Sequence, residues 1–179
     1  MKKILFALSL LLVTSMTTVK AQEDVKVRFG LTAGFNMTKW NGDYSSELGT
    51  SFMPGFNLGG VAEMQLFAQW SVQPELLFSY EGTNTDDFGT ASAMYIKLPV
   101  LVYYNFLNVG PGQLSPGVGP YFAGGVGGSF DGGSTLGYDG IAEKFDWGMQ
   151  IRVAYELQTL GVTALNGMYA YVGYEQGFT

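Results

Sequence analysis

The chain has 179 residues, with 15 acidic and nine basic residues and neither cysteine nor histidine. The absence of cysteine excludes disulfide bonds and thiol chemistry, and the absence of histidine removes the commonest general base and the commonest transition-metal ligand. The net charge of −6 argues against nucleic acid as a partner and against simple electrostatic attachment to anionic lipid.

The first 21 residues have the features of a secretory signal peptide. Two lysines follow the initiator methionine, an apolar run covers residues 4–13, and Val19–Lys20–Ala21 supplies a signal-peptidase motif. The apolar run is too short for a membrane-spanning helix. We expect removal of residues 1–21 to leave one domain over residues 22–179. Three of the nine basic residues lie in the signal peptide, so the net charge of this domain is 6 − 15 = −9.

Seven segments of the mature chain alternate apolar and polar side chains with a period of two residues, which predicts β-strands. The alternation is clearest in residues 70–81 and 93–106, where it continues for about twice the 5–6 residues of an ordinary strand. Strands of this length are typical of segments that cross a bilayer at a tilt. In chain order, the predicted strands cover residues 28–38, 52–66, 70–81, 93–106, 115–130, 143–157 and 167–178.

The connections between the predicted strands differ in length. Residues 67–69 form a short turn, whereas residues 39–51, 82–92 and 131–142 form longer polar loops that contain acidic residues. Short periplasmic turns and longer outer loops are typical of outer-membrane barrels. We therefore expect these three loops to form an acidic outer surface.

The segment 115–130 is the least regular of the predicted strands, because it is dense in glycine and its alternation is weak. Glycine permits tight curvature in a barrel strand. We place Tyr121 toward the interior and Phe122 toward the outside.

These features predict an all-β fold, namely an antiparallel up-and-down transmembrane β-barrel of the eight-stranded type. Seven strands are visible, whereas bacterial single-chain barrels have an even number. With seven strands, the first and the last run in the same direction and cannot pair as antiparallel neighbours. We therefore expect the C-terminal strand to be missing from this sequence or to come from elsewhere.

Each predicted strand has one apolar face and one face with polar or charged residues. In a membrane barrel the apolar face contacts lipid and the polar face lines the interior. The alternative is a lipocalin-like soluble periplasmic barrel whose apolar face encloses a small apolar ligand. The length of the strands and the aromatic residues near their ends favour the barrel in the outer membrane.

Several charged residues fall on the interior face of this barrel. An eight-stranded interior is just wide enough to be filled by side chains, and buried charges must be paired. We therefore expect a structural ion-pair network and no wide pore, and the alternative is a proton or ion path. The expected network comprises Glu63, Glu75, Lys97, Arg152 and Glu175.

The sequence offers little support for catalysis. Ser71 and Ser79 lie on the interior face near acids, but the chain has no histidine to activate either hydroxyl. Asp86–Asp87 lacks the spacing of an EF-hand calcium loop, and the glycine run at 124–128 lacks the lysine and helix of a phosphate loop. We expect no enzyme, no cofactor and no metal site.

Five motifs in this order carry a family resemblance: FGLTAGFN at 29–36, QPELLFS at 73–79, YIKLPVL at 95–101, GPYFAGG at 119–125 and FDWG at 145–148. Together they resemble the PorT-like outer-membrane β-barrel family of Bacteroidetes over essentially the whole mature chain. The resemblance implies an eight-stranded barrel in the outer membrane. The chain departs from this family at its end, where the terminal strand with its C-terminal aromatic residue is absent.

The function expected from these observations is a structural or interaction role, with the acidic outer loops presented to partners. The expected partners are outer-membrane lipid, the barrel-assembly machinery and an unidentified protein at the outer loops. Nucleic acid is not expected as a partner.

Overall fold

The computed structural model describes residues 4–5, 11–12, 17–21, 25–39, 50–67, 69–85, 89–130, 143–157 and 168–178. Every regular element in these ranges is a β-strand. Among the described residues, no helix is long and apolar enough to span a membrane.

Seven long strands make up most of the described chain. Alternating side chains and β-branched or aromatic residues favour this extended backbone. The long strands are β4 (Val25–Thr38), β5 (Ser51–Phe67), β6 (Trp70–Thr85), β7 (Gly89–Tyr104), β9 (Gly112–Phe130), β10 (Phe145–Leu157) and β11 (Tyr169–Gly177).

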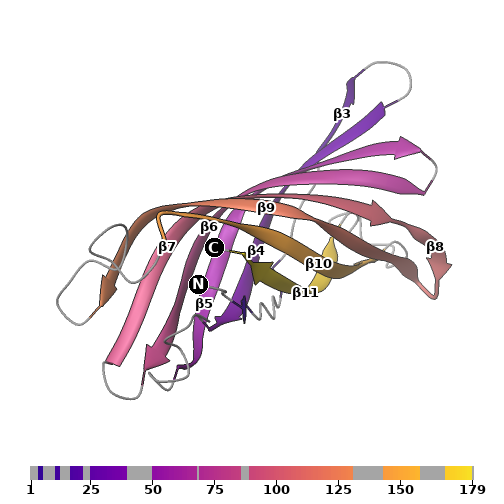
Figure 1. The fold of residues 1–179 in the computed structure, drawn as a ribbon. Coiled ribbons are helices and arrows are strands. Elements are labelled where there is room, and N and C mark those ends of the chain that lie inside the picture. The colour runs from indigo at the N-terminus through magenta and orange to yellow at the C-terminus, as the bar shows by residue number, and fades with distance from the viewer. Residues whose placement is uncertain are drawn as a thin grey trace.

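The long strands pair in the order β11-β10-β9-β7-β6-β5-β4, and every neighbouring pair is antiparallel. The short strand β8 (Phe106–Val109) pairs with β9 beside a turn at Gly110. Figure 1 shows the sheet curving into a half-barrel. The expected all-β, up-and-down barrel fold with seven visible strands is confirmed.

The two ends of the half-barrel carry different connections. The turn between β5 and β6 and the turn at Gly110 lie at one end, which we call the turn end. The connections from β4 to β5, from β6 to β7 and from β9 to β10 lie at the opposite end, which we call the loop end. Positions along each strand can therefore be ordered from the turn end to the loop end.

The prediction of a long loop at residues 82–92 is wrong for most of that range. β6 continues to Thr85 and β7 begins at Gly89, and the three residues between them, 86–88, lie outside the described residues. The two strands pair up to Thr85 and Gly89, and the Thr85 hydroxyl donates a 2.7 Å hydrogen bond to the Gly89 carbonyl oxygen. Gly89 has a φ of 78°, which glycine adopts without strain.

Three short strands lie within the segment expected to be a signal peptide. β1 (Ile4–Leu5) pairs with β11, whereas β2 (Leu11–Leu12) and β3 (Thr17–Ala21) pair with β4. They therefore lie along the two edge strands of the seven-stranded sheet. Strand pairing does not test cleavage, so the division at residue 21 remains a prediction.

The polarity of the two faces of the sheet is inverted relative to a soluble protein, because apolar side chains are exposed and polar side chains are buried. On β10, Ile151 and Val153 are 57% and 46% exposed, whereas Arg152 between them is 1% exposed. The same inversion holds on β9, where Tyr121 is fully buried and Phe122 is 45% exposed, as the sequence predicted. Bulky apolar side chains thus cover the outside of the half-barrel, and polar side chains fill its inside.

Two inward-facing glycines make room for interior tyrosines. A Cβ atom at Gly117 would lie 2.5 Å from the ring of Tyr103. A Cβ atom at Gly148 would lie 2.0 Å from the Gln176 carbonyl oxygen and 2.7 Å from the ring of Tyr121. These tyrosine rings therefore pack against bare backbone, which explains part of the high glycine content.

Candidate functional site: the charged barrel interior

The inner face of the half-barrel carries three groups of ion-paired side chains, which follow one another from the turn end toward the loop end. Buried charges are costly unless they are paired and hydrogen-bonded. The outermost group at the turn end is centred on Arg28, the next on Arg152 and the third on Lys97.

Arg28 on β4 binds two carboxylates. Its Nη2 lies 2.6 Å from Glu63 Oε2, and its two terminal nitrogens donate to Glu156 at 2.9 and 3.1 Å. The side chain of Arg28 is 29% exposed, and those of Glu63 and Glu156 are less exposed. This group therefore remains in contact with solvent.

Arg152 on β10 and Glu75 on β6 form the most deeply buried ion pair of the three groups. Arg152 Nη1 and Nη2 donate to Glu75 Oε1 and Oε2 at 2.5 and 3.1 Å, a bidentate geometry that fits guanidinium to carboxylate. Gln73 donates a further hydrogen bond to Glu75 at 2.7 Å, and Arg152 lies 4.0 Å above the ring of Tyr171. The pair fixes β6 and β10 against each other across the interior.

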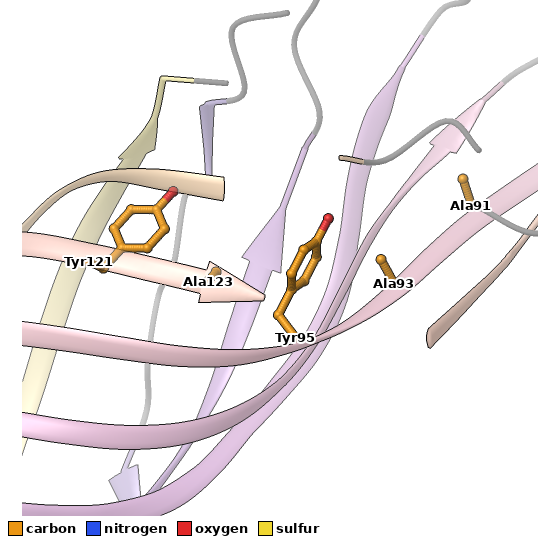
Figure 2. Close-up of a cluster of buried hydrophobic side chains, with 5 residues drawn as sticks. All are labelled: Ala91, Ala93, Tyr95, Tyr121 and Ala123. Atoms are coloured by element: carbon orange, nitrogen blue, oxygen red, sulfur yellow. The ribbon is translucent and has the colours of Figure 1, made fainter. Parts of the chain in front are cut away.

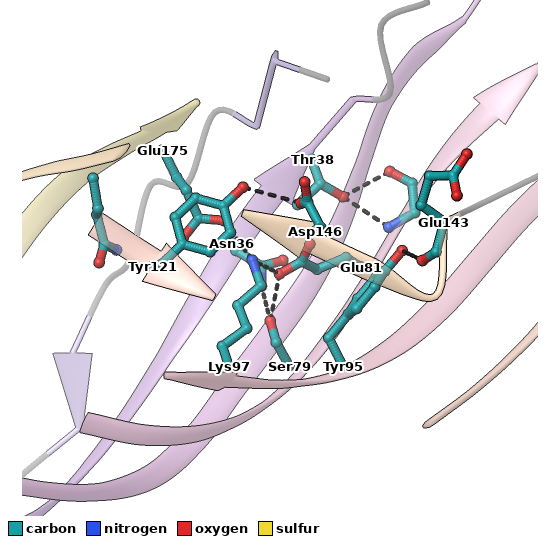
Figure 3. A network of polar contacts seen from close by, with 12 residues as sticks. Asn36, Thr38, Ser79, Glu81, Tyr95, Lys97, Tyr121, Glu143, Asp146 and Glu175 are labelled. Atoms are coloured by element: carbon teal, nitrogen blue, oxygen red, sulfur yellow. Dashed lines mark hydrogen bonds and ion pairs between the residues drawn. The ribbon is translucent and has the colours of Figure 1, made fainter. Parts of the chain in front are cut away.

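Lys97 on β7 contacts the carboxylates of Glu81 and Glu175 together. Figure 3 shows this group, in which Ser79 donates to Glu81 at 2.6 Å and the Tyr121 hydroxyl donates to Asp146 at 3.0 Å. A lysine ammonium has three donors, so one lysine can serve two carboxylates. The Lys97 contacts join β6, β7 and β11, and the Tyr121–Asp146 hydrogen bond joins β9 to β10. Lys97 Nζ lies 5.0 Å from the centroid of the Tyr121 ring, which brings the two sets together.

Small and aromatic side chains cover the interior beside the Lys97 group. Figure 2 shows Tyr95 and Tyr121 beside three alanines, Ala91, Ala93 and Ala123, all of which are buried. The alanines leave space that the two large rings occupy. These five side chains therefore pack together on the inner face near the loop end.

The structure places all five residues of the expected network on the inner face, but in three groups. Glu63 belongs to the Arg28 group, Glu75 and Arg152 form their own pair, and Lys97 and Glu175 belong to the third group.

The expected set omitted charged residues of the Arg28 group and of the Lys97 group. The omitted residues occupy the same alternate positions along the strands as the expected residues, so their side chains point to the same inner face. The period-two pattern of the sequence could therefore have found them. The omitted charged residues are Arg28, Glu81, Asp146 and Glu156.

The serines considered as nucleophiles take part in polar contacts. Ser79 donates to Glu81, and Ser71 accepts a 3.2 Å hydrogen bond from the Asn105 side chain. Asp86–Asp87 lies outside the described residues. Within the described ranges, no cluster of three or more acidic side chains could hold a metal ion.

Aromatic side chains gather on the outer face near both ends. At the turn end, the ring centroids of Trp70 and Tyr104 lie 5.0 Å apart and those of Tyr104 and Phe106 lie 4.8 Å apart. At the loop end, Trp147 packs edge-on against Phe178 at 5.1 Å. Trp40, which the sequence also places near the end of a predicted strand, lies outside the described residues. Girdles of aromatic residues at both interfaces are typical of membrane barrels.

Comparison with known families finds that residues 20–179 match the family described as "outer membrane protein beta-barrel domain". No curated protein matches the chain, and no solved structure matches it.

Proposed function

The chain belongs to the outer membrane protein β-barrel domain family, and on this premise we propose that it is a small outer-membrane barrel with a structural or interaction role. The observation that carries the proposal is the inversion of the two faces. Leu31, Leu58 and Leu76 are 66%, 56% and 57% exposed on three successive strands. Such a surface is unfavourable in water and favourable against hydrocarbon.

The proposed barrel has no wide pore. Its interior charges are held in the Arg28, Arg152 and Lys97 groups, and large rings fill the space near the loop end. This filling supports a role that depends on the surface of the barrel rather than on transport of large solutes.

We propose that this barrel is not an enzyme. The chain has no histidine, and both interior serines considered as nucleophiles are hydrogen-bonded to polar side chains that hold the interior together. A serine nucleophile needs a positioned base, and a carboxylate bound to lysine is a weak base for that task.

The interaction role rests on the sequence of the loops at the loop end. Acidic residues stand at Asp43, Glu47, Asp131 and Asp139 in the connections that flank β4, β5, β9 and β10. A cationic protein surface would be attracted to them. All four of these acidic residues lie outside the described residues.

The finer assignment that we propose is the PorT-like branch of Bacteroidetes. The motif at 73–79 places Gln73 and Glu75 at the Arg152 group, and the motif at 95–101 places Lys97 in the interior. A motif whose residues make specific contacts in the interior supports a family assignment better than a motif on the lipid-facing surface, where one apolar residue can replace another.

The proposed function is tested by fractionation and by heat-modifiable gel migration of the same sample. A membrane barrel is expected in the outer-membrane fraction, to need detergent for solubility, and to migrate differently before and after boiling. A chain that stays soluble without detergent in the periplasmic fraction would support the alternative lipocalin-like barrel and reject the proposal.

A further inference from the structure

A polar cavity of about 360 Å³ lies at the turn end of the half-barrel. Ligand sites for apolar molecules are lined mainly by apolar side chains, so this cavity does not suit such a ligand. At roughly 30 Å³ for each water molecule, the cavity has room for about a dozen waters. It is lined by Lys26, Arg28, Glu63, Gln65, Asn105, Gln113 and Glu156.

A second, smaller cavity of about 20 Å³ continues from the first. The two share Glu63, Asn105, Gln113 and Glu156 as lining residues. The smaller cavity, which we call the neck, has room for roughly one water molecule. Its lining also includes Gln73, whose amide donates to Glu75. The neck therefore extends from the Arg28 group to the Gln73 side chain, which is hydrogen-bonded to the Glu75 carboxylate.

Among the described residues, two buried polar atoms near this pair have no hydrogen-bond partner: Arg152 Nε and the Tyr171 hydroxyl. Tyr103 lines the neck and interacts electrostatically with Arg152. Buried polar atoms without a protein partner are commonly satisfied by internal water. The unpaired atoms thus favour entry of water through the neck as far as Arg152.

We propose that the turn end is an inlet for water and small hydrated ions, and that the Glu75–Arg152 pair is its seal. The proposal rests on the proposed function, because only a barrel in a bilayer separates its two ends. Beyond the seal the interior is closed again by the buried Lys97 group. Among the described residues, the two cavities therefore lie on the turn-end side of the Lys97 group.

The absence of cysteine makes single thiols a clean probe of this inlet. Ser115→Cys places a thiol in the neck, whereas Ser79→Cys places one beyond the seal, and both serines are buried. The probe is Ag⁺ added as silver nitrate to the folded barrel in detergent, because this ion is small and binds thiolate. Thiols left free are then counted with a maleimide reagent after denaturation, and the unsubstituted chain gives the background.

Ser115→Cys is expected to react with Ag⁺ several-fold faster than Ser79→Cys. In a Glu75→Gln/Arg152→Gln background, reaction at Ser79→Cys is expected to approach the rate at Ser115→Cys. An Arg28→Gln/Glu63→Gln background is the matched control, because it removes an ion pair outside the seal, and it should leave the rate at Ser79→Cys unchanged.

Equal rates for the two thiols in the otherwise unchanged chain would overturn the inlet, and so would a Ser115→Cys thiol that does not react. An unchanged rate at Ser79→Cys in a folded Glu75→Gln/Arg152→Gln barrel would overturn the seal. If that double variant does not fold, the comparison in the unchanged background still decides the inlet. Heat-modifiable migration is recorded for each sample, so loss of the barrel itself is distinguished from failure of the inlet.

Discussion

Arg152 and Glu75 are 77 positions apart in the sequence, yet they form a bidentate ion pair with side chains that are 1% and 0% exposed. The pair joins β10 to β6 across the interior rather than along the sheet. This side-chain contact between distant strands adds to the backbone hydrogen bonds that connect neighbouring strands. Its contribution can be measured by removing one partner and then both.

Breaking this pair is expected to destabilise the barrel strongly. Arg152→Met leaves the Glu75 carboxylate buried without its partner, which typically costs about 3–5 kcal/mol. The double variant Glu75→Leu/Arg152→Met removes both charges and should recover most of that loss. Urea unfolding of the detergent-refolded barrel measures the free energy of each variant. A double variant no more stable than Arg152→Met would contradict the assignment of the cost to an uncompensated charge.

A positive charge on the outer face should be costly only where the surface meets hydrocarbon. Ile151 is 57% exposed near the middle of β10, so Ile151→Arg is expected to cost about 2–4 kcal/mol in a bilayer. Val109 is also exposed but lies beside the turn at Gly110, and Val109→Arg should cost about 0–1 kcal/mol. Unfolding in lipid vesicles gives both values, and equal costs would place Ile151 outside the hydrocarbon.

Adding a single methyl group at Gly117 should disturb the interior. A Cβ atom there would lie 2.5 Å from the Tyr103 ring, and overpacking of this kind typically costs about 1–3 kcal/mol. Gly124→Ala is the control, because nothing lies within 4 Å of its Cβ position. Gly117→Ala with Tyr103→Ala should be less destabilised than the sum of the two single variants. A neutral Gly117→Ala variant would show that the Tyr103 ring moves freely.

Trp70 is expected to report the membrane interface. It lies at the turn end of β6, where it packs against Tyr104. In a variant with Trp40→Phe and Trp147→Phe, its fluorescence should be quenched more by nitroxide lipids labelled near the headgroup than by lipids labelled deep in the acyl chain. Adding Trp70→Phe and Ile151→Trp moves the only tryptophan to the middle of β10 and should reverse that order. Deep quenching of Trp70 would place the turn end inside the bilayer.

The alternation of apolar and polar residues could predict which face of the sheet each side chain occupies, because successive side chains along a strand point to opposite faces. It placed Glu75, Lys97 and Arg152 inside and Phe122 outside. It could not predict which charges pair, because Lys97 and Glu175 are 78 positions apart and meet only after the sheet has curved.

The pattern also failed at the β6–β7 connection. Gly82, Thr83 and Asn84 have the composition of a loop, yet they form strand. Their backbone groups pair with Ser92, Ala91 and Thr90, so the ladder continues where apolar alternation has ended. Composition reflects the environment of side chains and does not reveal how far a hydrogen-bonded hairpin extends.

The alternation of side chains along the seven strands also affects how such a chain could be exported. An unfolded polypeptide that moves through a secretion channel is retained in the first membrane it meets when about 20 consecutive residues are apolar. On β10, Asp146, Gln150, Arg152 and Glu156 interrupt every such run. The same polar and charged side chains that hold the folded interior together would therefore let the unfolded strand cross one membrane before it inserts into another.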